Sequence, residues 1–418
     1  MKKEANFELL DLKIGISMYD PELDQQGMMV QPFTSNNLLE LHYIEDITKS
    51  NVLLIIKLND SSSSVLSNIQ GMEPIDITWT DTYDNVISYS MIIYDVKDRM
   101  VIDGKKSQAT LYCVSVDAVR NSAKKISRRF GKGGGKFTHE LVTELMKDEI
   151  KTDKTVDVDE SATKLSFVSP YWDPYTIISW LAWRSILQDG SGKKSAGYLF
   201  YEDRRGYHFR AMDSLVEEPK AKDIKVNFSA NDLDDETIAV DGFTVSGASD
   251  IFRGLNLGSY ASTTFTLDMK DFKYTETPFF INDFYDSMKK LNPASELPEF
   301  YKRFGGQELG GEPTRIMSKV IDSAMYTEGT YTQELTRQLS QSMIRNQLFF
   351  NQSATFQYEG KQDLYIGDVV MVTKYNAKTG DIDPEISGRY IIGKIYRQFL
   401  TERDTMSTQV TLYRDSVE

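Results

Sequence analysis

The sequence has little from which to build redox, zinc or membrane-spanning structure. Only one of its 418 residues is a cysteine, Cys113, which excludes an intrachain disulfide and a four-cysteine zinc site and is typical of a reducing compartment. The longest aliphatic run, residues 52–56, falls far short of the about twenty apolar residues of a membrane helix. No apolar stretch of signal-peptide length follows Lys2 and Lys3, so we expect no export by that route.

Positive charge is also scarce. Lys and Arg number 48 against 62 Asp and Glu, a formal net charge of −14 that repels a polyanion at long range. Sequence-specific DNA binding is therefore a poor hypothesis. With 40% hydrophobic and 26% charged residues, the composition is that of a folded protein. At roughly 150 residues per domain, the length allows about three domains.

The first 118 residues have the pattern of short β-strands. Alternating or dense apolar runs at 75–79, 91–94 and 109–116 predict strands. Turn residues such as Asp84-Asn85 and Asp103-Gly104 separate them. This spacing favours an antiparallel barrel or sandwich of about a hundred residues.

A mixed segment, 119–222, opens with a basic, glycine-rich stretch at 118–137 that marks the domain boundary. Leu141 to Met146 predict one helix, and Asp173-Pro174 predicts the capped start of a second that continues through Leu187 to Gly190. Residues 197–212 predict a hairpin around Arg204-Arg205-Gly206.

Strand patterns return at 223–248, followed by an irregular insertion at 249–329. Residues 330–418 predict a helix capped by Thr330 and then strands at 355–358, 369–372, 390–396 and 409–413. Residues 91–94 and 108–112 are echoed by 390–392 and 409–413, so we interpret the two β regions as an internal duplication.

Motifs of catalysis and metal binding are incomplete. Gly135-Lys136 lacks the earlier glycine and the following Ser or Thr of a phosphate loop, so the basic segment predicts a flexible, solvated linker or, less favoured, a contact to an acidic partner or DNA. His139-Glu140 has Thr143 where a zinc protease needs its second histidine. His42, His208 and Cys113 are expected to be structural.

The remaining candidates also favour structural roles. No Gly-x-Ser-x-Gly elbow occurs. The acidic runs 231–236 and 381–385 lack the spacing of a calcium loop and predict solvated loops, although pairs of acid/base carboxylates stay open as an alternative. The aromatic residues between Tyr171 and Trp183 have helical spacing, which favours a core or subunit contact over a sugar platform. We therefore predict no enzyme, no cofactor, and no catalytic or metal site.

In the order of its parts the chain resembles the central baseplate hub proteins of contractile-tailed phages of the T-even type, whose fold is shared with the hub part of type VI secretion spikes. Three stretches carry the resemblance: 108–146, 167–209 and 331–414. The third is the most specific, with its helix, the strand start Gly367-Asp368, the strand at Gly388-Arg389-Tyr390 and the terminal alternating strand.

The resemblance implies a mainly β fold with an α+β insert: two tube-like antiparallel β-barrels and a mixed α/β domain built from discontinuous segments. The expected division is 1–118, first barrel; 119–222, mixed domain; 223–248, start of the second barrel; 249–329, an insertion packing with the mixed domain; and 330–418, a helix and the remainder of the second barrel.

It further implies a homotrimer in which six barrels match a six-fold tail tube on one face and a three-fold spike on the other. The expected partners are the spike protein and the tube or tube-initiator protein, with further contacts to the tape measure and baseplate wedges. DNA would pass through a channel without specific binding. The expected location is the virion tail baseplate, after synthesis in the host cytoplasm.

Three alternatives stay open at this point. One is the hub of a non-contractile tail. Another is a peptidoglycan-degrading tail-tip hydrolase that uses an acidic pair within 247–329. The last is a receptor- or carbohydrate-binding tail component, which predicts exposed aromatic residues at 171–183, whereas the hub hypothesis places most of them in a core.

Overall fold

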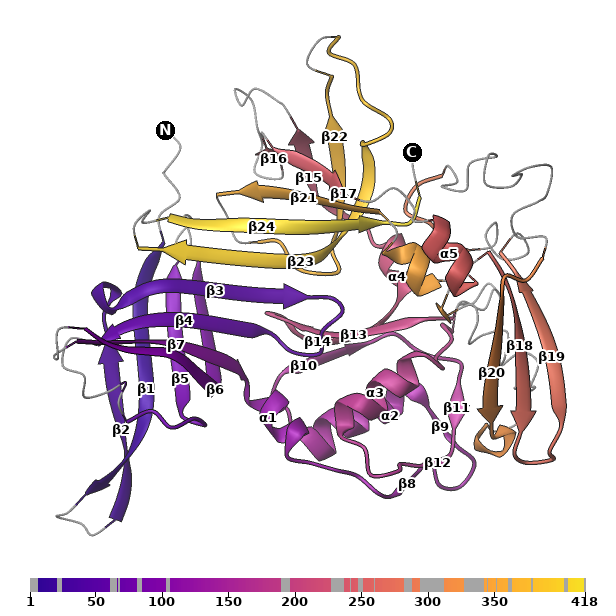
Figure 1. Cartoon of the computed structure of the whole chain (residues 1–418), viewed down its shortest axis with the longest axis horizontal. Coiled ribbons are helices and arrows are strands. Elements are labelled where there is room, and N and C mark those ends of the chain that lie inside the picture. Colours follow the sequence, from indigo (N-terminus) through magenta and orange to yellow (C-terminus); the bar gives the residue numbers. More distant parts are fainter. Residues whose placement is uncertain are drawn as a thin grey trace. The chain divides into compact units, whose positions relative to one another are not determined.

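The structure is a computed structural model of the whole chain. It describes residues 7–20, 25–60, 66, 68–80, 85–102, 106–188, 196–226, 237–240, 242–246, 251–258, 260–281, 288–293, 312–326, 342–343, 345–350, 352–359, 363–376, 379–401 and 405–416. The fold is mainly β with several sheets and a few helices, which confirms the predicted class (Figure 1). None of the helices in the described ranges is long and apolar enough to cross a membrane.

The chain forms two compact units, each built from separate stretches of sequence. Unit 1 comprises Met1–Ala123, Gln357–Ile366 and Lys394–Val410, and unit 2 comprises the rest. Strands β23 (Gly388–Leu400) and β24 (Thr405–Arg414) each contribute residues to both units. The predicted domain boundaries remain a prediction.

Unit 1 is an antiparallel sheet in the order β2-β1-β5-β6-β7-β4-β3, continued by the second part of β23. Its elements are β1 (Glu8–Asp20), β2 (Gln25–Phe33), the 3₁₀ turn η1 (Ser35–Asn37), β3 (Leu38–Asp46), β4 (Leu53–Asp60), β5 (Pro74–Thr80), β6 (Val86–Ile102), β7 (Lys106–Ser115) and α1 (Val116–Ser122). Buried and less buried residues alternate along β4, β5 and β7, as expected for strands with one face on a core. Trp79 and Tyr43 lie fully buried in that core.

In the mixed part of unit 2, helices pack against a three-stranded sheet in the order β10-β14-β13. Figure 1 shows α2 and α3 beneath β13 and β14, and residues of all four share one hydrophobic core. The elements are β8 (Arg129–Phe130), β9 (Lys136–Phe137), α2 (Thr138–Glu144), the π-helical turn η2 (Leu145–Ile150), β10 (Thr155–Val158), β11 (Lys164–Leu165), β12 (Phe167–Val168), α3 (Pro174–Ala182), β13 (Tyr198–Asp203), β14 (Gly206–Ala211) and α4 (Met212–Glu217).

Helix α3 starts as predicted but ends early. The Asp173 side chain accepts a hydrogen bond from the Thr176 backbone at 2.9 Å, and Pro174 is the first helical residue. The helix stops at Ala182 because side chains take over its last carbonyls: Arg184 donates to the Trp180 oxygen at 3.1 Å, and Ser185 donates to Leu181 at 2.8 Å. The predicted continuation to Leu187 is wrong, and Gly190 lies outside the described residues.

The predicted hairpin is confirmed, with β13 and β14 paired from Tyr198–Ala211 to Asp203–Gly206. The remaining strands of unit 2 are β15 (Lys220–Val226), β16 (Thr237–Val240), β17 (Phe243–Ser246), β21 (Gln352–Tyr358) and β22 (Val369–Lys374). β15 pairs in parallel with both β16 and β22, whereas β22 pairs antiparallel with β23 and β17 antiparallel with β21.

The stretch predicted as an irregular insertion contains regular structure. Helix α5 (Ile251–Leu257) precedes a three-stranded sheet of β18 (Ala261–Asp268), β19 (Tyr274–Phe280) and β20 (Arg315–Ile321), which the 3₁₀ turn η3 (Ser323–Met325) follows. Threonine-rich strand β18 is central, with β19 antiparallel and β20 parallel to it. Sequence reasoning missed it because prolines and glycines beside these strands masked their alternation.

Both halves of the proposed sequence repeat fall on neighbouring strands. Strands β6 and β7 pair antiparallel through Ile93–Cys113, and β24 lies next to β23 in its sheet. The predicted strands of the C-terminal region are therefore present. Of the predicted helix at 330–349, only residues 342–343 and 345–349 are described as helical; its start at Thr330 and the acidic run 231–236 lie outside the described residues.

Candidate functional site

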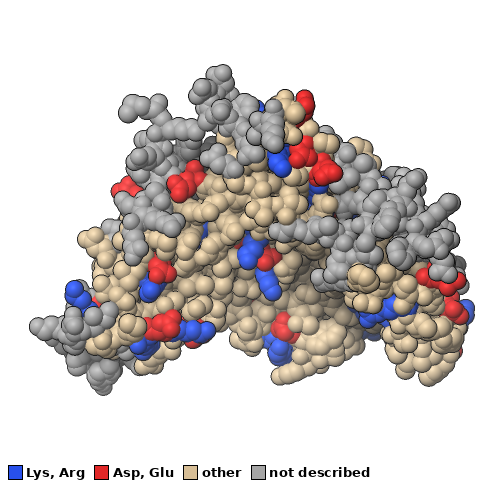
Figure 2. Space-filling model, turned by 45° about the horizontal axis from the view of Figure 1, so that its top comes forward, with Lys and Arg blue, Asp and Glu red and all other residues tan. Residues whose placement is uncertain are grey.

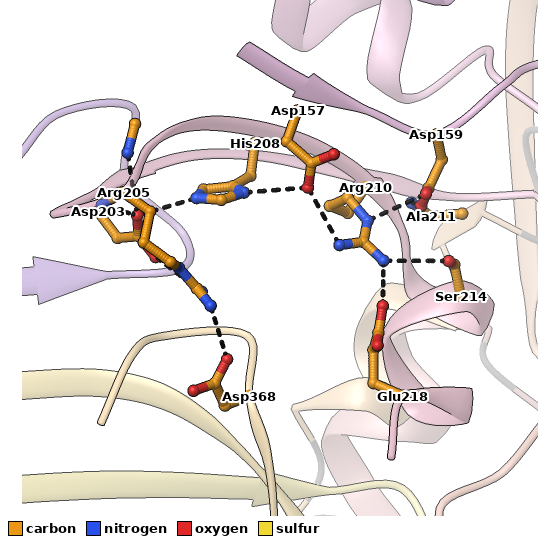
Figure 3. A network of polar contacts seen from close by, with 11 residues as sticks. Asp157, Asp159, Asp203, Arg205, His208, Arg210, Ala211, Ser214, Glu218 and Asp368 are labelled. Atoms are coloured by element: carbon orange, nitrogen blue, oxygen red, sulfur yellow. Dashed lines mark hydrogen bonds and ion pairs between the residues drawn. The ribbon is translucent and has the colours of Figure 1, made fainter. Parts of the chain in front are cut away.

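A set of charged side chains meets on the β13–β14 hairpin and the neighbouring strand β10 (Figure 3). β10 pairs in parallel with β14, which places Asp157 opposite His208. The turn of the hairpin consists of Arg204 and Arg205. The network is therefore assembled by the register of two strands and one tight turn.

Asp203 organises the turn. Its Oδ1 accepts hydrogen bonds from the Arg205 backbone at 2.7 Å and from the Gly206 backbone at 3.2 Å, the usual role of aspartate before a tight turn. The Arg205 guanidinium returns to Oδ2 of the same carboxylate at 2.9 Å. The side chain of Asp203 is fully buried, so each of these contacts replaces lost hydration.

His208 lies between two carboxylates. Its Nε2 is 2.9 Å from Asp203 Oδ1, its Nδ1 is 3.3 Å from Asp157 Oδ2, and its ring stacks on Tyr201. Burial by itself raises the pKa of Asp203, but the contacts with His208 and Arg205 outweigh burial, so its pKa lies below the ordinary value. The buried carboxylate is therefore held in its charged form.

Two arginines connect this network to other segments of unit 2. Arg205 reaches Asp368, just before β22, at 2.9 Å, while Arg210 contacts Asp159 at 3.0 Å, Asp157 at 3.2 Å and the Glu218 carboxylate. Burial opposes the charge of both guanidiniums, but the neighbouring carboxylates raise the pKa of each. In Figure 3 acidic residues alternate with arginine or histidine from Asp368 through His208 to Glu218.

The arrangement is suited to holding strands together. Each carboxylate and guanidinium named here has a partner of opposite sign at contact distance, and the Ser214 hydroxyl drawn with them accepts a hydrogen bond from Arg210 at 3.4 Å. Within the described ranges, no group of three or more His, Cys, Asp or Glu could hold a metal ion. The ion pairs of this site link β14 and its turn to the β10 segment, to α4 and to the residue before β22.

The other histidines and the cysteine also lie in structural surroundings. His139 Nδ1 accepts a hydrogen bond from the Ser161 backbone at 2.9 Å, and His42 Nδ1 is 2.6 Å from the Tyr396 hydroxyl. Cys113 is buried in the core of unit 1, and burial raises its pKa far above the ordinary range. A thiol so placed is not a nucleophile at neutral pH.

The basic, glycine-rich segment is not a flexible linker, and that prediction is wrong. β8 and β9, within the segment, pair with β12 and β11. Arg128 makes ion pairs with Glu144 at 2.8 Å and Glu149 at 2.9 Å, and Lys136 pairs with Glu144 at 2.8 Å. Much of the positive charge of this segment is therefore neutralised by ion pairs within the fold. On the face of the molecule drawn in Figure 2, blue and red side chains lie next to each other.

The aromatic residues of 171–183 divide between core and surface. Tyr175 is buried, and Trp172 and Trp180 pack against the same core, whereas Tyr171 is 69% and Trp183 41% exposed. The sequence did not lead us to the charged network, although it carries a signal. Asp157, in β10, and Asp159, just after that strand, are two residues apart, and so are His208 and Arg210 in the paired strand β14.

The comparisons with known proteins concern the fold alone. No protein-family model matches the chain, and no curated protein matches its sequence. Two solved structures match it over nearly their whole length. A tail protein from Neisseria meningitidis MC58 has a TM-score of 0.55 and 9% identity, covering 99% of this chain and 98% of its own. The 43 kDa tail protein of prophage MuSo2 from Shewanella oneidensis has a TM-score of 0.55 and 8% identity, covering 97% of this chain and 100% of its own.

This chain has the fold of phage tail proteins. At 8–9% identity the likeness does not extend to individual residues, so the roles of the side chains above rest on their geometry in this structure. The predicted resemblance to the hub fold is confirmed at the level of architecture.

Proposed function

We propose that this protein is a structural hub of a phage tail or related injection machine, and not an enzyme. The observation that carries the proposal is the match, over nearly the whole length of both chains, to two tail proteins. The charged network supports this proposal, because its side chains contact one another within the fold. The protein would be part of the virion tail, at the baseplate.

In this proposal three copies form a ring that joins a six-fold tail tube to a three-fold spike. Duplicated β regions would give six quasi-equivalent modules per trimer, a geometric reason for an internal repeat. The sequence repeat supports this, since β6 with β7 and β23 with β24 are neighbouring strand pairs with similar sequences. Spike and tube proteins would bind opposite faces, with the tape measure and baseplate wedges as further contacts.

The acidic charge suits a channel that DNA passes through. Three chains at −14 carry −42 formal charges, and phosphates would find few cations to hold them if part of that charge faces the channel. A solved structure of the ring would test this directly. A channel lined by Lys and Arg would contradict it.

The decisive experiment is a mass measurement of the purified full chain, alone and with its spike protein, by light scattering or native mass spectrometry. We expect a trimer of 47.7 kDa chains, either in the purified protein alone or once the spike protein is added. A stable hexamer, or a monomer that persists with the spike, would contradict the proposal.

A hydrolase is the competing function. We expect no clearing in peptidoglycan zymography of the purified protein. Clearing that is lost when a carboxylate within 247–329 is substituted would replace the hub proposal with an enzyme.

A further inference from the structure

The central strand of the β18–β20 sheet buries polar side chains instead of apolar ones. Residues that lie opposite each other in paired strands point to the same face of a sheet. On the inward face of β18, all four residues are polar and buried: Ser262, Thr264, Thr266 and Asp268. A sheet with one solvated face normally buries its apolar residues and exposes its polar ones. The inward face therefore does not explain why the sheet carries so many large apolar residues.

Those apolar residues lie on the outer face and in the turn that joins β18 to β19. Leu267 lies opposite Tyr274 on one side and Val320 on the other. Phe265 stacks on Tyr274, with ring centroids 5.5 Å apart. Six large apolar residues here are exposed, from 37% at Leu267 to 73% at Phe272. We call these six the outer patch: Leu267, Met269, Phe272, Tyr274, Ile316 and Val320.

Phe272 adopts a backbone conformation that is unusual for a bulky residue. Its φ is +54°, in the left-handed region that favours Gly or Asn. The turn around it is ordered, since the Lys270 backbone donates to Asp268 Oδ1 at 3.0 Å and the Lys273 backbone donates to Asp271 Oδ1 at 3.1 Å. Because the ring is mostly exposed, it adds little to the core of its own chain. A contact with another molecule would explain why a strained position holds an aromatic residue.

The outer patch has the size of an interface. With about 150–200 Å² for each large apolar side chain, the exposed fractions of the six amount to roughly 600 Å². The largest apolar patch on a typical monomer covers about 300–600 Å², and a stable complex buries about 800 Å² on each partner. The outer patch and the polar residues at its rim can therefore form one side of a stable complex.

The charge of the sheet indicates the kind of partner. Residues 260–281 and 312–321 contain four Lys or Arg and four Asp or Glu, so this part is neutral in a chain with a net charge of −14. On the outer face of the three strands, all of which are described, only Glu276 is charged. Two copies of an acidic chain repel each other at long range, and a neutral part reduces that repulsion. The patch therefore suits an acidic partner such as the chain itself.

We propose that the outer patch packs against a second copy of this chain. In the proposed ring of three copies, on which this inference rests, each copy presents the patch to a different surface of the next copy, as a three-fold rotation requires. Burial of six apolar side chains favours association because it removes them from water. Phe272 and Tyr274 are the central contacts, since buried aromatic residues contribute most to the stability of interfaces.

Sedimentation velocity of the purified full chain, from about 1 to 100 µM, tests the proposal. We expect the mass to rise from one chain to three with concentration. Tyr274→Lys combined with Val320→Lys should weaken association at least about a hundredfold, because two charges would have to be buried. The double variant is less negative than the wild type, so stronger repulsion between copies could not explain the loss.

The matched control is Val86→Lys combined with Val101→Lys. Both valines are exposed on β6 in unit 1, and the change in net charge is the same. This variant should associate as the wild type does.

Phe272→Asn separates docking from folding, and it decides if the double lysine variant fails to fold. Asparagine tolerates a positive φ, so the thermal unfolding midpoint of the monomer should stay the same or rise. Association should weaken about tenfold or more, because an aromatic contact is lost. A loss of association without a loss of stability assigns the role of Phe272 to the interface.

The outcomes distinguish this inference from the ring itself. A trimer that persists in both the double lysine variant and Phe272→Asn would overturn the inference and leave the ring of three copies. A wild-type dimer that is lost in these variants would support the patch as a contact between copies and contradict the ring. A wild type that stays monomeric over the whole concentration range would overturn the inference.

Discussion

Gly206, at the end of the β13–β14 turn, is constrained by its surroundings as well as by its own backbone. Its φ is +138°, and a Cβ built there would lie 2.4 Å from the Thr155 carbonyl oxygen of the paired strand. A side chain would therefore strain the backbone and also push β10 away from β14. The charged network depends on that pairing, since Asp157 and His208 face each other across it.

We predict that Gly206→Ala lowers the free energy of unfolding by about 2–4 kcal/mol, measured by urea denaturation. Gly133→Ala is the matched control, because its φ is +80° but no atom lies within 4 Å of the added Cβ. It should lose only about 1 kcal/mol. Equal losses in the two variants would show that the contact with Thr155 is unimportant.

Asp203 should make stability sensitive to acid. Its folded-state pKa is lowered, so its contribution is complete above the unfolded value of about 3.9 and is lost as pH falls through the folded value. We predict that the wild type loses more stability between about pH 5 and pH 2 than Asp203→Asn does. Urea unfolding across this range measures it, with the exposed Asp271→Asn as a control that follows the wild type. Parallel curves for wild type and Asp203→Asn would contradict the prediction.

For single residues, the sequence predicts a local role or environment better than it predicts which distant residue a side chain contacts. The buried, inert environment of Cys113 and the cap formed by Asp173 follow from local pattern, and both are confirmed. The contact of Arg205 with Asp368 joins residues 163 positions apart, and no local pattern specifies it. Ion pairs of this kind need the fold before they can be recognised.

Among the elements of unit 2, one buried arginine joins three segments. Arg345 donates to Asp213 in α4 at 2.8 Å and to Asp415, after β24, at 2.6 Å, and its other Nη reaches the Lys289 carbonyl at 3.0 Å. Arg345 and Asp415 are fully buried, so each needs the other for charge balance. Asp415 also accepts a hydrogen bond from the Leu291 backbone.

We predict that Asp415→Asn, which keeps the shape but removes the charge, lowers the free energy of unfolding by about 3–5 kcal/mol. Lys13→Met is the control, since it breaks an ion pair with Asp11 in which both side chains are exposed. That variant should change stability little. A loss in Asp415→Asn no greater than in the control would mean that Arg345 finds another partner.

Sequence patterns predicted strands in unit 1 but failed at the end of α3 and in the β18–β20 sheet. In unit 1, sequence patterns predicted β5, part of β6 and β7, and the burial pattern of β7 alternates residue by residue because one face of the strand lies on the core. The end of α3 was mispredicted because side chains of Arg184 and Ser185 close it, a tertiary choice that leaves the apolar periodicity unbroken. The sheet of β18–β20 was missed because prolines and glycines lie beside its strands and because the inward residues of β18 include Ser262, Thr264 and Thr266 instead of aliphatic residues.

For DNA binding by the whole molecule, the distribution of charge matters more than the net charge. The net charge of −14 coexists with a segment, 118–137, that carries seven Lys and Arg and no Asp or Glu. In the fold, Glu144 and Glu149 neutralise Arg128, and each pairs with one further lysine, Lys136 or Lys124. The segment therefore contributes little free positive charge with which to grip DNA.

We predict that the wild-type protein does not retain duplex DNA in an electrophoretic shift assay, even at about 50 mM salt. A Glu144→Gln, Glu149→Gln double variant should gain weak binding that disappears as salt is raised, because it releases Lys124, Arg128 and Lys136. Asp271→Asn with Asp223→Asn makes the same change in net charge elsewhere and serves as the control. Tight DNA binding by the wild type would contradict the prediction.

Unit 1 is built from separate stretches of the chain, and this sets the order in which its strands can pair during synthesis. Strand β3 pairs with residues Lys394–Leu400 of β23, which leave the ribosome 271 residues after Ala123 completes the first stretch of the unit. At about 5–20 residues per second, the edge of β3 waits roughly a quarter of a minute to a minute for its neighbour. A chain interrupted before residue 394 therefore presents an unfinished sheet, and such truncated products should be recognisable to chaperones and proteases before they can enter an assembly.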